Sequence, residues 1–210
     1  MLDTLTKLYD DFTKSGRVQD LGQLAHEEGM QFQKRTKFGN QPTELKSFKI
    51  FQGKGYKRLL GLMARKASDF EGKIRFYDFL ETVDLETYTH SILEVKCDAI
   101  FIESLRIEPK GAFKKMKGFF ISDESPFPAL SEFNNQFQIS SKEPDDILWL
   151  QEKALELMEG FKGLTMEAHG NYFIFYFRKK TVKIHEILDL ADFAEEFVRL
   201  VCNDRSGDFV

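Results

Sequence analysis

"HGNYFIFYFRKK", residues 169–180, places six consecutive apolar or aromatic residues before three cations, and this stretch decides the fold class. Alternate side chains of a strand point to opposite faces, so a strand over residues 172–177 has two apolar faces. Such a strand is typical of the interior of a sheet that is covered on both sides. The run is far shorter than the roughly 20 residues that a membrane-spanning helix needs. We therefore predict a central strand whose end emerges into water at Arg178.

Segments with a period of two surround this strand. The residues from Leu59 to Ile107 contain four alternating runs, which predict four consecutive strands of an antiparallel meander. One of them, "KIRFYDFLETV", places Asp78 on the same face as Phe76 and Leu80. Residues 45–51 and 134–141 also alternate in part and are predicted as strands. The runs on either side of "HGN" predict a second hairpin.

Helical spacing marks the two ends of the chain and one internal segment. Residues 2–16 and 18–29 predict a pair of helices, with Gly16 ending the first, and residues 110–118 predict a short helix. Residues 141–161 predict one helix with Pro144 near its start and Leu148 on its apolar face. Residues 183–201 predict a closing helix. The fold class is thus α+β: a largely antiparallel sheet, made of a meander and a C-terminal hairpin and flanked by helices. An N-terminal helical pair at 1–29 precedes an α+β domain at 30–210, together forming one compact unit.

Composition is that of a globular protein with an aromatic core. The 210 residues include 22 Phe and carry a net charge of −4. This charge gives no overall attraction to nucleic acid or anionic lipid. The two cysteines, Cys97 and Cys202, lack any CxxC spacing and indicate buried or incidental thiols in a reducing compartment. Because we find neither a secretory signal nor a membrane-spanning run, we expect a cytoplasmic location.

The segments that most resemble a metal-binding motif and a phosphate-binding loop are each incomplete. A zincin helix needs a second His four places after the first, and position 30, four places after His26, is Met30. The segment "GKGYKR" has neither the spacing nor the hydroxyl of a phosphate loop. The remaining histidines, His90, His169 and His185, are far apart in sequence. We assign no catalytic residue, cofactor or metal, and we expect Asp78 to be a hydrogen-bonded structural carboxylate.

The strongest local signal is electrostatic. Residues 35–66 carry nine cations against Glu44 alone, a net charge of +8. A surface of this kind suits phosphates, anionic headgroups or an acidic protein. Alternatively, the cations are outward-facing residues that protect sheet edges from pairing. The nine candidate residues are Arg35, Lys37, Lys46, Lys49, Lys54, Lys57, Arg58, Arg65 and Lys66.

Several segments, taken in order, resemble a bacterial domain family of unknown function that often occurs in membrane-associated proteins. They are "KIRFYDF", "THSILEV", "LRIEPKGAF", "FNNQFQISSKEPDDILWLQEKALELMEGF" and "LTMEAHGNYFIFYFRKK", within roughly residues 25–200. The resemblance implies an intact domain. It implies no activity, ligand or functional residue.

These observations favour a non-enzymatic interaction or scaffold domain that binds another protein. The alternative is an anion-binding module that contacts membrane headgroups or nucleic acid through residues 35–66. A third possibility, an enzyme of unknown type, requires a pocket where carboxylates or histidines converge.

Overall fold

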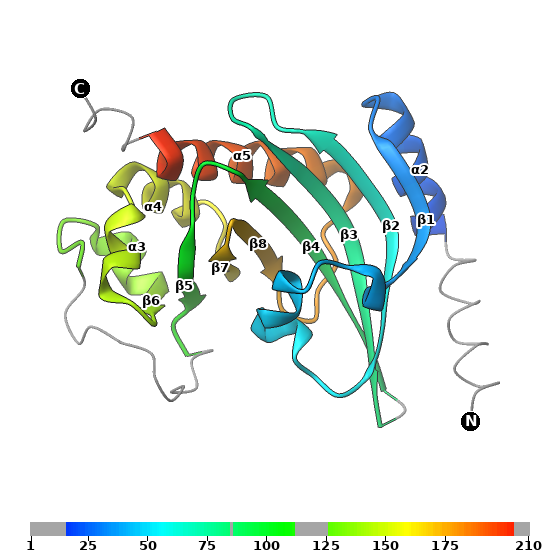
Figure 1. Cartoon of the computed structure of the whole chain (residues 1–210), viewed down its shortest axis with the longest axis horizontal. Coiled ribbons are helices and arrows are strands. Elements are labelled where there is room, and N and C mark those ends of the chain that lie inside the picture. Colours follow the sequence, from blue (N-terminus) through cyan, green and yellow to red (C-terminus); the bar gives the residue numbers. More distant parts are fainter. Residues whose placement is uncertain (1–15, 85, 112–125, 204–210) are drawn as a thin grey trace.

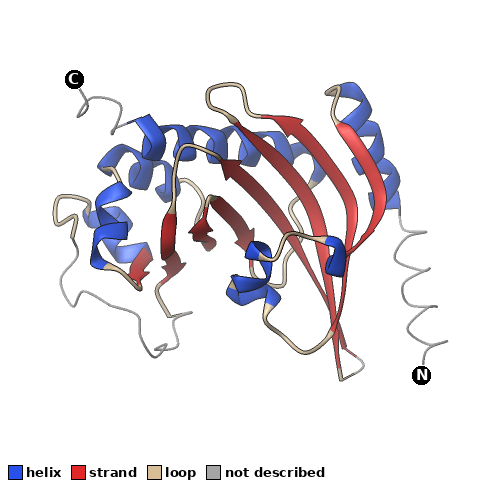
Figure 2. Cartoon of the chain, in the orientation of Figure 1, coloured by secondary structure: helices blue, strands red, loops and turns tan. Residues whose placement is uncertain are grey.

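The computed structural model describes residues 16–84, 86–111 and 126–203. Its centre is one eight-stranded sheet in the order β1-β2-β3-β4-β8-β7-β5-β6, and every neighbouring pair is antiparallel. Helices and sheet together confirm the predicted α+β class (Figures 1 and 2). The strands are β1 Gln31–Lys37, β2 Tyr56–Lys66, β3 Gly72–Val83, β4 Glu86–Cys97, β5 Ile102–Pro109, β6 Phe137–Ser141, β7 Leu164–Gly170 and β8 Tyr172–Phe177.

The predicted central strand is β8, which lies between β4 and β7. Phe173 and Phe175 belong to the hydrophobic cluster on one face of the sheet, and Ile174 and Tyr176 belong to the cluster on the other. All four side chains are buried. The double coverage inferred from the alternation is therefore confirmed.

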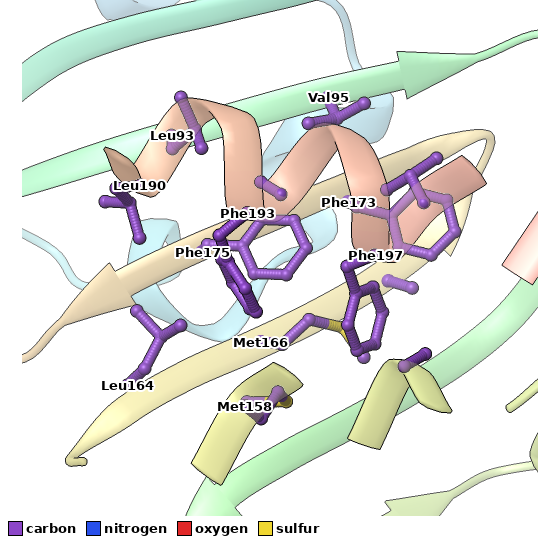
Figure 3. Packing of buried hydrophobic residues seen from close by; sticks show 14 of the residues in the cluster. Leu93, Val95, Met158, Leu164, Met166, Phe173, Phe175, Leu190, Phe193 and Phe197 are labelled. Atoms are coloured by element: carbon purple, nitrogen blue, oxygen red, sulfur yellow. The ribbon is translucent and has the colours of Figure 1, made fainter. Parts of the chain in front are cut away.

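Among the described residues, four α-helices cover one side of the sheet, which we call the helix face. They are α2 Gly16–Glu27, α3 Ser131–Gln136, α4 Glu152–Glu159 and α5 Ile187–Asn203. The longest, α5, runs behind the middle of the sheet (Figure 1) and sets Phe193 and Phe197 against Phe175, with ring centroids 5.6 and 5.5 Å apart. Figure 3 shows these rings packed among aliphatic and Met side chains. The predicted C-terminal and second N-terminal helices are confirmed, although Gly16 is the first residue of α2.

The opposite side of the sheet is covered by three short 3-10 turns, Phe38–Asn40, Glu44–Ser47 and Lys49–Phe51. We call residues 38–51 the strap and the side beneath them the strap face. The predicted strand over 45–51 is wrong because the buried residues Leu45, Phe48 and Phe51 recur every three positions, the period of a 3-10 turn. Phe51 packs edge-on against Phe79 of β3, with centroids 4.9 Å apart.

The predicted four-strand meander is wrong in its last step. Strands β2, β3 and β4 are consecutive neighbours, but β5 pairs with β7 and β6. The β7–β8 hairpin lies between β4 and β5, and Cys97 N donates to the Asn171 carbonyl at its turn (2.9 Å). Three strand spacings are roughly 14 Å, which the link at 98–101 can span. The short link between β4 and β5 predicted that these two strands pair. In the sheet, however, β5 lies three strands away from β4.

Two further predictions differ in detail. Residues 134–141 divide between the end of α3 and β6, and residues 141–161 divide into a 3-10 turn at Pro144–Trp149 and α4. The Asp146 carboxylate accepts from the backbone N–H groups of Glu103 and Ser104, which holds this turn against β5. Leu148 is 73% exposed and does not face the sheet as expected. The helices predicted at 2–16 and 110–118 lie outside the described residues, apart from Gly16 and the turn at 110–111.

Candidate anion-binding pocket

One row of side chains on the strap face crosses five neighbouring strands. The register sets Arg75 opposite Glu94, Glu94 opposite Ile174, Ile174 opposite Glu167, and Glu167 opposite Arg106. Arg75 binds both oxygens of Glu94 at 2.8 and 2.5 Å, and Arg106 binds Glu167 at 2.8 Å. The central isoleucine therefore has a buried ion pair on each side.

Two buried tyrosines extend the row. Tyr77 donates its hydroxyl proton to Glu94 at 3.1 Å, and Tyr176 donates to Glu167 at 2.5 Å. Burial raises the pKa of each phenol well above its ordinary value, and the neighbouring carboxylate raises it further. Both hydroxyls therefore remain protonated donors across the physiological pH range.

The strap is attached to this network through Lys49. Its backbone N–H donates to Glu167 at 3.0 Å, and its ammonium lies 3.8 Å from Glu108 Oε1. Arg178 also binds Glu108, at 2.6 Å. Arg106 adds a third cation, 3.7 Å from the other oxygen of Glu108. Three cations thus share two carboxylates, so this part of the strap face carries an excess of positive charge.

The Lys49 ammonium is a buried member of the network without a described hydrogen-bond acceptor, and Glu108 Oε2 is likewise buried without a described donor. Burial lowers the pKa of Lys49, and Glu108 opposes that effect. A buried donor without an acceptor is costly, since its hydration is lost without replacement. Lys49 is therefore a candidate contact for an anion.

A cavity of about 520 Å³ opens beside Lys49 at the end of the strap. Strap residues, β3, β4 and β8 form its wall, and the turn after β8 contributes Arg178 and Lys179. Apolar atoms make up most of the exposed wall, although five of the ten lining residues are Lys, Arg, His or Glu, and a small-molecule site commonly combines an apolar wall with placed polar groups. Its residues are Lys49, Ile50, Gly53, Glu81, Val83, Tyr88, His90, Tyr176, Arg178 and Lys179.

His90 and Lys179 form one side of this cavity. Lys179 has a positive φ of 52°, and its backbone N–H donates to His90 Nδ1 at 3.0 Å. Burial, together with the charges of Lys179 and Arg178, lowers the pKa of His90 to about 4. The imidazole is therefore neutral near pH 7, with its proton on Nε2. The Lys179 ammonium lies 3.8 Å from the centroid of the Tyr88 ring, a cation–π contact.

Gly53 and Glu81 form another part of the wall. A Cβ atom at Gly53 would lie 1.9 Å from Glu81 Oε1, so the carboxylate occupies space that only glycine leaves. The same oxygen is buried and has no hydrogen-bond donor among the described residues. The cavity thus combines an excess of cations with one acceptor, an arrangement suited to an anion that also carries a donor group.

Of the nine cations predicted to form an anionic-partner surface, Lys49 alone lines this cavity. The other eight cations do not share one surface, because the strand register places those that lie on strands on different faces of the sheet. Arg35, Lys37, Arg58 and Arg65 belong to the helix face, where Arg65 binds Glu195 at 2.7 Å. Lys57 points to the strap face and donates to the Phe51 carbonyl. Lys46 and Lys54 lie on the strap and the loop after it, and Lys66 lines a second cavity.

The other residues singled out in the sequence have structural surroundings. Asp78 is fully buried and accepts from Arg17 (2.5 Å) and Ser91 (2.6 Å), which ties α2 to the sheet. The sulfurs of Cys97 and Cys202 lie 2.8 Å apart as free thiols, and this contact lowers the pKa of Cys97 to about 7. Within the described ranges, no group of three or more His, Cys, Asp or Glu could hold a metal ion.

Sequence reasoning missed the residues that build the site. Arg106 and Glu108 alternate within "LRIEP", and Glu94 and Glu167 interrupt apolar runs. A charged residue in the middle of such a run is rarely buried without a partner, so these four positions signalled buried ion pairs. Their partners could not be named from spacing, because they lie on strands distant in sequence.

The comparisons with known proteins identify a fold. No protein-family model matches the chain, and a search of curated proteins found no match. Among solved structures, it is similar to the crystal structure of the mycobacterial trehalose monomycolate transport factor A, TtfA, with a TM-score of 0.62 and 10% sequence identity. The similarity covers 89% of this chain and 97% of that one. Separately, none of the helices within the described ranges is long and apolar enough to cross a membrane.

Proposed function

We propose that this chain is a non-enzymatic binding domain whose cavity receives a small organic anion with an apolar part. The observation that carries the proposal is the buried Lys49 ammonium, which has no described hydrogen-bond acceptor and lies beside a largely apolar wall. An anionic group would complete the coordination of Lys49 and offset the excess of cations around Glu108. The apolar remainder would displace water from Ile50 and Val83.

Binding is favoured over catalysis by the state of the groups around the cavity. A general base needs a free lone pair and a pKa near the working pH. The Nδ1 atom of His90 already accepts from Lys179, and the hydroxyl of Tyr176 is engaged by Glu167, whereas the Oε1 atom of Glu81, without a donor among the described residues, lies against Gly53. The structurally similar TtfA is a transport factor, a role that does not name a reaction. From that neighbour we take a fold-level analogy alone.

The proposal can be tested with decanoate and its neutral counterpart decanol, measured by titration calorimetry. We expect decanoate to bind and Lys49→Met to weaken that binding at least tenfold, with little change for decanol. Lys46→Met is the matched control, because it removes the same charge from an exposed strap position. Equal weakening by both variants, or no binding of decanoate to the wild type, would contradict the proposal.

A protein partner is our second candidate, and exposed apolar residues favour it. Phe101 is 69% exposed just before β5, and Leu148 is 73% exposed on the turn that Asp146 pins to β5. A partner with an apolar surface would bury both. We expect Phe101→Ser with Leu148→Ser to abolish capture of such a partner from a bacterial lysate while thermal stability stays unchanged. Capture that survives the double change would exclude this surface.

The location and the family remain proposals that go with this function. We propose a cytoplasmic protein from the bacterial domain family that the sequence motifs resemble. Fractionation of bacterial cells that express the chain would test the location. Recovery of the chain in the membrane pellet after a high-salt wash would contradict it, since salt releases proteins held by surface charge alone.

A further inference from the structure

Three lysines stand directly opposite one another on the strap face. The register pairs Lys66 of β2 with Lys73 of β3, and Lys73 with Lys96 of β4. Their neighbours Ile74 and Val95 belong to the cluster on the helix face, so Lys73 and Lys96 point to the strap face. We call this row the lysine ladder. It runs parallel to the Arg75–Glu94 row, two residues along each strand.

The two rows differ in charge balance. In the Arg75 row, each arginine has a glutamate opposite it on the neighbouring strand. In the lysine ladder, Lys96 binds Asp98, but no carboxylate among the described residues lies within ion-pair distance of Lys66 or Lys73. Opposed side chains on neighbouring strands are about 4.5–5.5 Å apart at Cβ, and like charges at that separation destabilise a sheet. The ladder therefore lowers stability unless an anion binds.

Protection of a sheet edge does not account for the ladder. Lysines discourage edge strands from pairing with other chains. Strands β2, β3 and β4 each have a neighbour on both sides, because β1 covers β2 and β8 covers β4. Their backbone groups are already paired, so a row of lysines has no edge to protect here.

The ladder lines a cavity of about 650 Å³ at the β2–β3 hairpin end of the sheet. The Phe70 ring closes against Gly72, where a Cβ atom would lie 2.8 Å from the ring and 2.1 Å from the Lys96 carbonyl. Ala64 and Ala67 add further apolar wall. The site is therefore a recess around the ends of β2, β3 and β4: the lysine ladder lies on the strap face, the Phe70 ring packs toward the helix-face cluster, and the carboxylates of Glu71 and Asp98 also line the wall.

We propose that Lys66, Lys73 and Lys96 bind the phosphoryl group of a phosphorylated small molecule or of a phospholipid headgroup. A phosphoryl dianion has three terminal oxygens and can accept bonds from several ammonium groups, each of which is a compact point charge. A carboxylate carries one charge and leaves the ladder repulsive. The Phe70 ring can pack on the remainder of the ligand. This site is separate from the Lys49 cavity, so neither proposal depends on the other.

The test uses inorganic pyrophosphate and titration calorimetry at low salt. We expect Lys73→Gln to weaken pyrophosphate binding at least tenfold, and Lys66→Gln with Lys73→Gln to abolish it. Lys153→Gln is the matched control because Lys153 is an exposed lysine of α4. Equal affinity for the wild type and Lys73→Gln overturns the proposal.

A second readout separates a binding role from a folding defect. Without phosphate at low salt, Lys73→Gln should raise the melting temperature, because it removes like-charge repulsion. Pyrophosphate should raise the melting temperature of the wild type and not that of the variant. A lower melting temperature for Lys73→Gln without phosphate would contradict the repulsion on which the site rests.

Vesicles distinguish the two sources of the phosphoryl group. Binding to vesicles that contain phosphatidic acid, lost in Lys73→Gln, would assign a lipid headgroup. Binding of free pyrophosphate without vesicle binding would assign a soluble phosphorylated ligand. Failure of the wild type to bind either probe at low salt overturns the proposal.

Discussion

The two faces of the sheet are covered by different structures, and their interiors differ accordingly. The α-helices of the described ranges cover the helix face over a cluster of Phe, Leu, Ile, Val, Ala and Met side chains. The strap face is covered by short 3-10 turns, with buried ion pairs under them and cavities beside them. A long amphipathic helix presents a continuous apolar stripe, whereas short turns present a few side chains each. We therefore expect the helix face to contribute most of the stability, and the strap face to hold the proposed binding sites.

The largest effect should come from the helix face. Phe197→Ala removes a fully buried ring that packs on Phe175 and Phe193, and it should lower the free energy of unfolding by about 3–5 kcal/mol. Urea unfolding measures this loss. Phe101→Ala is the control at an exposed ring and should change stability by less than about 0.5 kcal/mol. Comparable losses of unfolding free energy for Phe197→Ala and Phe101→Ala would contradict the expectation that the helix face contributes most of the stability.

The next effect tests the ion pairs of the strap face. Glu167→Gln removes the charge that binds Arg106 and leaves that guanidinium buried, which should cost about 3 kcal/mol. Adding Arg106→Met should recover part of the loss, since the buried charge is then gone. Both values come from urea unfolding. A double variant no more stable than Glu167→Gln would mean that the pair is not the source of the effect.

A smaller effect is expected where the strap meets the cavity. Gly53→Ala places a methyl group on the Glu81 carboxylate and should destabilise the protein by about 1–2 kcal/mol. Combining it with Glu81→Ala should relieve the overlap and restore most of the loss. Thermal unfolding of both variants checks this coupling. Additive losses would show that Gly53 and Glu81 are not in contact.

The smallest effect concerns His90 and pH. Its pKa is about 4 in the folded chain and about 6.5 in an unfolded chain, so the unfolded state takes up the proton first as pH falls. Stability is therefore complete above pH 6.5 and is lost progressively between pH 6.5 and 4. His90→Asn, whose side-chain oxygen can still accept from Lys179, should lose stability less steeply in this window. Identical pH profiles would contradict the assignment.

The period of the apolar residues predicted an element correctly where the pattern within that element shows which of its faces are buried. The apolar run of β8 indicates two buried faces, and the apolar stripe of α5 indicates one. The core strand, its hairpin and the closing helix were therefore predicted. Periodicity failed at residues 45–51, where a three-residue repeat resembles an interrupted alternation. It also failed at β5, because loop length does not say which strands lie between two ends.

The sequence by itself determined the fold class, the central strand and the local excess of cations, because these depend on neighbours along the chain. Only the tertiary structure decided which charges meet. Inserting the β7–β8 hairpin between β4 and β5 brings Glu94 and Glu167 to either side of Ile174 and gives each an arginine. The pairing of β2, β3 and β4 likewise aligns three lysines from separate segments. Pairing between strands is set by the register of the whole sheet, which no single segment contains.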